Sequence, residues 1–185
     1  MDLLLWLGEN SYNIWGSKTQ LLPTFAACNG NIKLYGSLQS LMKMHPLFDL
    51  AIAYIVMHDP CGIVVLSRSA KQIIWHSRWR SRLKNVMLHT NLTEFDMTRV
   101  IFVDQSSHAR YSKILCSMDV ALDPFPFGGG VTLCDAVAGS CAKESGKPGE
   151  VCLNEDLLDA NTRCQVPFVT VGELQSVHRM GVGIA

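Results

Sequence analysis

Two kinds of apolar pattern alternate along the chain. Short continuous apolar runs bounded by turn residues predict buried strands at residues 62–66, 99–103, 120–122 and 168–171. Longer stretches with helical spacing predict helices at residues 46–58, 69–87 and 107–118, a helix that ends near residue 138, and a last helix from about residue 174. Apolar strands separated by helices are typical of a parallel sheet covered on both sides. The pattern therefore predicts an α/β fold: an open, parallel, Rossmann-like sheet with helices on both faces.

The ends of the chain and one internal stretch depart from this rhythm. Residues 1–37 have no strong period, so we expect a poorly defined N-terminal segment there, followed by one domain over residues 38–185. Residues 140–165 are rich in turn and cap residues and poor in apolar ones, which predicts an inserted surface loop. The chain stops at Ala185 in an expected helix without a helix-ending signal. We therefore expect a truncated C-terminus.

The predicted helix at 69–87 is both basic and aromatic. It carries two tryptophans four residues apart, Trp75 and Trp79, which the spacing places on one inward stripe. Its basic residues, which we expect to be solvated, are Lys71, Arg78, Arg80, Arg82 and Lys84. The alternative is an interaction module in which this helix binds RNA or an acidic partner.

Composition limits the classes of partner. The chain has 185 residues, of which 48% are hydrophobic and 17% charged, as in a folded domain. Sixteen basic and sixteen acidic side chains give zero net charge, so no overall field favours nucleic acid or an anionic membrane. No apolar run approaches the roughly 20 residues that span a bilayer. We predict no nucleic-acid partner, no membrane partner, and a cytoplasmic or nucleocytoplasmic location.

The cysteines are odd in number and lack the close pairs of a zinc site. There are seven of them, at positions 28, 61, 116, 134, 141, 152 and 164. In a chain that is not a small secreted scaffold, this predicts reduced, mostly buried thiols, and a disulfide framework is the alternative. Cys141, Cys152 and Cys164 are the possible exception, because all three fall in the expected loop.

Residues 119–139 carry the most specific chemistry. A short strand leads into a turn at Gly128, Gly129 and Gly130, and a helix is expected to open at Val131 or Thr132. A helix start leaves backbone N–H groups unpaired and carries partial positive charge, which favours phosphate. Neither a P-loop nor the dinucleotide-binding glycine spacing is present. The segment predicts a site for a nucleotide diphosphate, and an ordinary tight turn is the alternative.

A second loop is expected to share this ligand. In open α/β sheets, ligands lie where the loops after several strands converge, beyond the carboxyl ends of the strands. The glycine turn and the loop at residues 104–107 both follow predicted strands. We therefore expect both loops at the same edge of the sheet.

Several segments together resemble one family. Residues 39–49, 99–102, and 119–139 continued at 166–170 resemble the C-terminal half of O-GlcNAc transferase and its relatives, including plant SPINDLY-type and bacterial protein N-glycosyltransferases. The resemblance runs from residue 38 to the C-terminus, except for the insertion. It implies the nucleotide-sugar-binding half of a GT-B glycosyltransferase. The implied donor is UDP-GlcNAc or a related UDP-sugar, the acceptor is a Ser, Thr or Asn of a protein, and no metal or other cofactor is expected.

The resemblance also implies residue roles. Lys43 matches a lysine that contacts the donor diphosphate, where an ammonium stabilises the charge that grows on the leaving group. The remaining matches are Gly130, Val131 and Thr132 for phosphate, Asp135 for the ribose hydroxyls, and His108 with Tyr111 for the uracil. The alternatives are a solvated lysine, an aspartate favoured by the helix dipole, and a surface histidine.

The resemblance leaves half of the enzyme unaccounted for. The family's catalytic base and acceptor cleft belong to an N-terminal Rossmann half, and about 38 residues are too few to form one. We expect this chain alone to bind a nucleotide sugar without transferring it, because acceptor positioning supplies much of the rate enhancement. A non-catalytic nucleotide-sugar sensor is the second alternative, beside the basic-helix interaction module.

Overall fold

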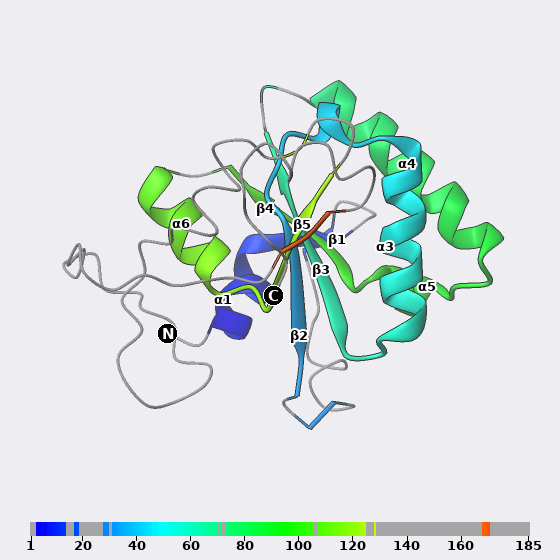
Figure 1. Ribbon diagram of the computed structural model, residues 1–185, viewed down its shortest axis with the longest axis horizontal. Helices are drawn as coiled ribbons and strands as arrows, with labels where there is room; N and C mark the ends of the chain where they lie inside the picture. The colour runs from blue at the N-terminus through cyan, green and yellow to red at the C-terminus, as the bar shows by residue number, and fades with distance from the viewer. Residues whose placement is uncertain are drawn as a thin grey trace.

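A six-stranded sheet forms the centre of the protein (Figure 1). The computed structural model describes residues 3–13, 17–18, 28–29, 31–69, 71, 73–105, 107–124, 128 and 168–170. The strands are β1 (Ser11–Asn13), β2 (Lys33–Ser37), β3 (Gly62–Arg68), β4 (Val100–Asp104), β5 (Val120–Asp123) and β6 (Phe168–Thr170). Their order is β1-β4-β3-β2-β5-β6, and every neighbouring pair is parallel except β1 with β4. The predicted parallel α/β sheet is confirmed, with one antiparallel edge strand.

Helices cover both faces of the sheet, as predicted (Figure 1). They are α1 (Leu3–Asn10), α3 (Pro46–His58), α4 (Ile73–His89), α5 (Glu94–Met97) and α6 (His108–Cys116), with a 3-10 turn, η1, at Leu41–Lys43. Leu7 of α1 and Ile114 of α6 join one buried cluster, whereas Phe48 of α3 and Trp79 of α4 join the other. The sheet therefore separates two hydrophobic cores.

The central strands are buried because their side chains alternate between these cores. In β3, Ile63 and Val65 enter the cluster under α1 and α6, and Val64 and Leu66 enter the cluster under α3 and α4. All four are fully buried. This is why the sequence of β3 is continuously apolar.

Most predicted elements are found within a few residues of their expected ends. The helix at Pro46–His58 has the predicted bounds, with Pro46 in its first turn and His45 as its N-cap. The strands β3, β4, β5 and β6 and the helices α4 and α6 are also present. The expected helices near residues 131–138 and after 174, the inserted loop at 140–165 and the C-terminal end lie outside the described residues.

The sheet extends across the predicted division at residue 38. Strand β2, which no apolar pattern indicated, lies before this point and pairs with β3 on one side and β5 on the other. Its sequence, Lys-Leu-Tyr-Gly-Ser, has only two large apolar side chains. Gly36 has no side chain because a Cβ there would lie 2.6 Å from the Met118 side chain.

The expected orientation of helix α4 is only half right. Trp79 is buried, with 3% exposure, but Trp75 is 44% exposed. The buried residues of α4 are His76, Trp79, Leu83 and Met87. At about 100° per residue, Trp75 lies on the rim of that stripe and His76 takes the inward position.

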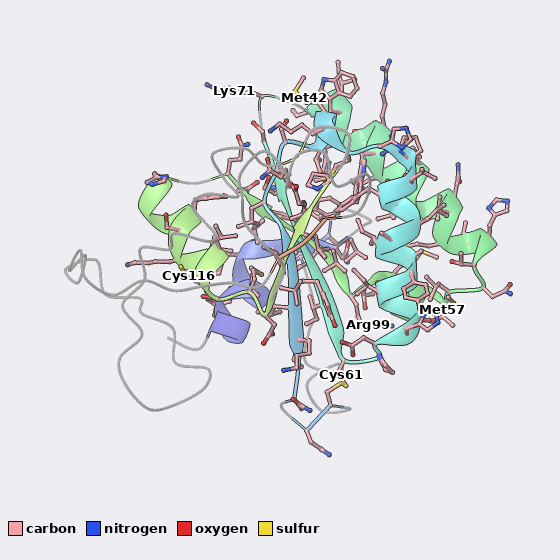
Figure 2. All side chains as sticks on the ribbon, in the orientation of Figure 1. Met42, Met57, Cys61, Lys71, Arg99 and Cys116 are labelled. Atoms are coloured by element: carbon pink, nitrogen blue, oxygen red, sulfur yellow. A yellow bond between two sulfur atoms is a disulfide. The ribbon has the colours of Figure 1, made fainter. Side chains whose placement is uncertain are left out.

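Three of the described cysteines are disulfide-bonded, so the prediction of reduced thiols is wrong for them. Cys28 and Cys61 form a disulfide with a Cα–Cα distance of 5.7 Å. It joins the residues before β2 to those before β3, at the end of the sheet opposite Met42 and Lys71 (Figure 2). Cys116 is disulfide-bonded as well. Disulfides are typical of oxidising compartments. They therefore argue against the predicted cytoplasmic location, which stays a prediction.

Among the described residues, no helix is both long and apolar enough to cross a membrane.

Candidate functional site

The strand order reverses between β2 and β5. From β2 the chain builds β3 and β4 to one side, then returns through α6 to place β5 on the other side of β2. At such a switch point the loops after the two adjacent strands run apart and open a crevice at the carboxyl ends of the strands. The crevice in this chain is therefore expected between the residues that follow Ser37 and those that follow Asp123.

Lys43 lies in the segment that follows β2. It ends η1, just before α3, is half-buried, and donates a hydrogen bond from Nζ to Oε1 of Gln39 over 3.3 Å. Leu41 and Met44, on either side of it, are buried in the core. The residues on both sides of Lys43 are thus held in the core.

A buried ion pair fixes the same segment, and the sequence analysis missed it. Asp49 of α3 is fully buried and accepts two hydrogen bonds from Arg82 of α4, at 2.5 and 3.0 Å. Arg82 also donates to the backbone oxygen of Met44, one residue after Lys43, over 2.8 Å. Burial raises the pKa of Asp49, and the hydrogen bonds and charge of Arg82 oppose that rise. The sequence signal that could have indicated this ion pair is Asp49 itself, the only carboxylate among the mostly apolar residues 46–58.

Gly128 lies against the end of β5. A Cβ at this position would approach Oδ2 of the buried Asp123 to 2.7 Å, so only glycine fits there without a shift. The other predicted phosphate and ribose contacts lie outside the described residues: Gly129, Gly130, Val131, Thr132 and Asp135.

His108 and Tyr111 lie one turn apart on α6. His108 is exposed at the start of α6, and Tyr111 is half-buried one turn later. Their rings are nearly parallel, with an interplanar angle of 18° and centroids 6.3 Å apart. Helix α6 follows β4, so its start belongs to the carboxyl edge of the sheet, which also carries Lys43 and Gly128.

Other polar groups gather at the same edge. Ser67, near the end of β3, donates from Oγ to the backbone oxygen of Gln39 over 2.9 Å and so ties the loop after β2 to the sheet. Ser37, the last residue of β2, is buried, and its hydroxyl has no partner among the described residues. Within those residues, no group of three or more His, Cys, Asp or Glu side chains is arranged to hold a metal ion.

Comparisons with known proteins give a structural likeness but no matching family model. No protein-family model matches the chain, and no curated protein matches it. Among solved structures, the chain is similar to a mutant O-GlcNAc transferase from Thermobaculum terrenum, with 19% sequence identity and a TM-score of 0.45. The match covers 55% of this chain and 18% of that one, so this chain corresponds to a small part of that protein. A likeness of this size establishes neither a family nor a function.

Proposed function

We propose that this chain binds a nucleotide sugar, UDP-GlcNAc or a related UDP-sugar, between β2 and β5, as the donor-binding half of a GT-B protein glycosyltransferase. The observation that carries the proposal is the strand reversal at this point. Lys43 follows one strand of this adjacent pair and Gly128 follows the other, which supports placing the donor diphosphate between the two segments. The resemblance of residues 39–49 and 119–139 to the O-GlcNAc transferase family supports the choice of ligand.

Each residue has a role that follows from its chemistry. Transfer breaks the bond between the sugar C1 and a diphosphate oxygen, so negative charge grows on the departing UDP. The Lys43 ammonium stabilises that charge, together with backbone N–H groups of Gly129 to Thr132. Asp135 accepts hydrogen bonds from the ribose hydroxyls, and the rings of His108 and Tyr111 contact the uracil.

In the same proposal, sugar transfer needs a protein that also includes an N-terminal Rossmann half. A protein hydroxyl or amide must reach C1 and lose its proton, and the resemblance implies that the base for that proton belongs to an N-terminal Rossmann half. The chain alone is therefore expected to bind the donor without transfer. A transfer assay with UDP-GlcNAc, on a version that includes an N-terminal Rossmann half, separates an enzyme from a sensor.

The first test is UDP binding to the purified chain, measured by calorimetry and by thermal unfolding. UDP is expected to raise the unfolding temperature, because a ligand that binds only the folded state stabilises it. Lys43→Met is expected to weaken binding about tenfold or more, which corresponds to about 1.4 kcal/mol. Lys71→Met is the matched control, since Lys71 is an exposed lysine after the neighbouring strand β3, at the same end of the sheet (Figure 2). Equal affinity in the two variants, or no binding to the folded chain at millimolar UDP, contradicts the proposal.

A further inference from the structure

A second group of basic side chains lies at the ends of β3 and β4, away from the strand reversal. Arg68 and Asp104 are register partners on these parallel strands, so their side chains leave the same face of the sheet. Two residues earlier on that face, Leu66 and Phe102 pack into the core under α4. The ring of His76 in α4 meets the Phe102 ring edge-on, with centroids 4.7 Å apart.

Arg80 belongs to the same group. It lies four residues after His76, so both leave the same face of α4, and the charge of Arg68 acts on both groups. The guanidinium of Arg68 stacks over the Tyr12 ring at 3.5 Å, which fixes its plane. The cluster therefore combines Arg68, His76 and Arg80 above a floor of two aromatic rings, and we call it the α4 basic cluster.

Two nitrogens of this cluster are buried without a hydrogen bond. His76 is 8% exposed, and neither its Nε2 nor the Nε of Arg80 has a partner within the part of the chain that the structure describes. Buried polar groups in folded proteins nearly always have partners. Two orphaned nitrogens four residues apart on one helix face therefore indicate a group that accepts from both.

The cluster also carries more positive than negative charge, which favours an anion. Asp104 is its one described carboxylate, and both of its oxygens accept from Arg68, at 2.5 and 3.2 Å. Arg80 forms no ion pair with any described residue. Burial and then the charge of Arg68 lower the pKa of Arg80. Burial, followed by the charges of Arg80 and Arg68, lowers the pKa of His76 to about 4, and Asp104 opposes this in part. One positive charge thus remains beside a neutral imidazole.

We propose that the α4 basic cluster binds a single oxyanion group, a carboxylate or a phosphate, of a ligand distinct from the nucleotide sugar. The oxyanion accepts from Nε of Arg80 and from Nε2 of His76 in the tautomer that carries its proton there. Arg68 adds a second cation, already oriented by Asp104 and Tyr12. The single unbalanced charge suits one anionic group and is too small for a diphosphate.

The test follows the imidazole of His76 in the full chain labelled with ¹⁵N-histidine. Potassium phosphate and potassium acetate are titrated separately near neutral pH, with chloride keeping the ionic strength constant. We expect a saturable shift of the His76 nitrogen signals with at least one anion at millimolar concentration, and the anion that acts at the lower concentration identifies the ligand class. No saturable shift with either anion overturns the proposal.

Variants separate this site from other anion sites. Arg80→Met is expected to lose at least tenfold in affinity, and Arg80→Lys, which keeps the charge but not the Nε–H, to lose less. Arg78→Met is the control, because Arg78 is exposed on the same helix beside Trp75. Lys43→Met should respond as the wild type, so this outcome does not depend on the donor site. In chloride, Arg80→Met should be no less stable than the wild type. If Arg80→Met binds the anion with unchanged affinity, or is clearly less stable than the wild type in chloride, the role of Arg80 is refuted.

Discussion

The contact between Asp49 and Arg82 gives the sharpest test of how the Lys43 segment is held. Arg82→Met removes the guanidinium and keeps most of the side-chain stem. It deletes two hydrogen bonds to a fully buried carboxylate and one to the backbone oxygen of Met44. Breaking a buried ion pair by removing one partner costs about 3–5 kcal/mol. Because the Arg82 side chain is 35% exposed, water replaces part of the loss, and we expect a decrease of about 2–3 kcal/mol in the free energy of unfolding.

The pH dependence of that deficit distinguishes a lost charge partner from lost packing. The pKa of Asp49 in the folded state is raised, so its contribution to stability is greatest below the unfolded value of about 3.9 and is lost as pH rises through the folded pKa. Without Arg82, the largest influence that opposes the effect of burial is lost, and only the smaller effects of Trp79 and His45 remain. The deficit of Arg82→Met should therefore be larger near pH 7 than near pH 4.

Urea unfolding followed by tryptophan fluorescence, to which the buried Trp79 contributes, measures this loss of stability. Arg78→Met is the matched control, and as an exposed change it should stay within about 0.5 kcal/mol of the wild type. Asp49→Asn should cost less than Arg82→Met, because the remaining guanidinium is partly hydrated and keeps its bond to Met44. A loss below about 0.5 kcal/mol for Arg82→Met, or a deficit that does not change with pH, would refute the reasoning.

Two further predictions concern protons. The pKa of His76 is lowered to about 4, chiefly by burial, so its contribution to stability is present above about pH 6.5 and is lost as pH falls toward 4. Between about pH 7 and 5, wild type should lose about 2 kcal/mol more than His76→Gln in chloride buffer, measured by urea unfolding, and equal losses contradict this. The pKa of Tyr35 is raised to about 12 by burial and by its hydrogen bond to Asp59, 2.8 Å long. Its contribution holds below about pH 10 and is lost as pH rises to 12, so the tyrosinate absorbance of the wild type should show a late-titrating phenol that Tyr35→Phe lacks.

The parts of the fold that the sequence predicted are those with a strong period. Strand β3 is buried on both faces and is therefore continuously apolar, and α3 has a proline in its first turn and apolar residues on nearly every side. The outer side of α3 nevertheless carries Leu50 and Tyr54 exposed to solvent, so the pattern gave the helix but not its burial. The helix at Leu3–Asn10 was missed because its eight residues form too short a pattern.

The pairing of strands also explains why Cys28 and Cys61 are close enough to form a disulfide. Cys28 and Cys61 are 33 residues apart and share no motif, yet they precede neighbouring strands of one sheet. Their proximity follows from the pairing of β2 with β3, which spacing in the sequence does not reveal. The same holds for Arg68 and Asp104, which become register partners only once β3 and β4 are aligned.

The position of the candidate site depends on the one central strand that the sequence did not predict. The glycine turn and the loop before His108 were expected to share an edge, and Lys43 was placed beside them by resemblance alone. Strand β2 supplies the physical reason, because it ends just before Lys43 and pairs with β5, which leads to Gly128. Without β2, the strand order would show no reversal and Lys43 would have no fixed relation to the glycine turn. In the proposed donor site, a short strand with a glycine and a polar end therefore determines which lysine contacts the diphosphate, and the comparison of Lys43→Met with Lys71→Met tests this consequence of the topology.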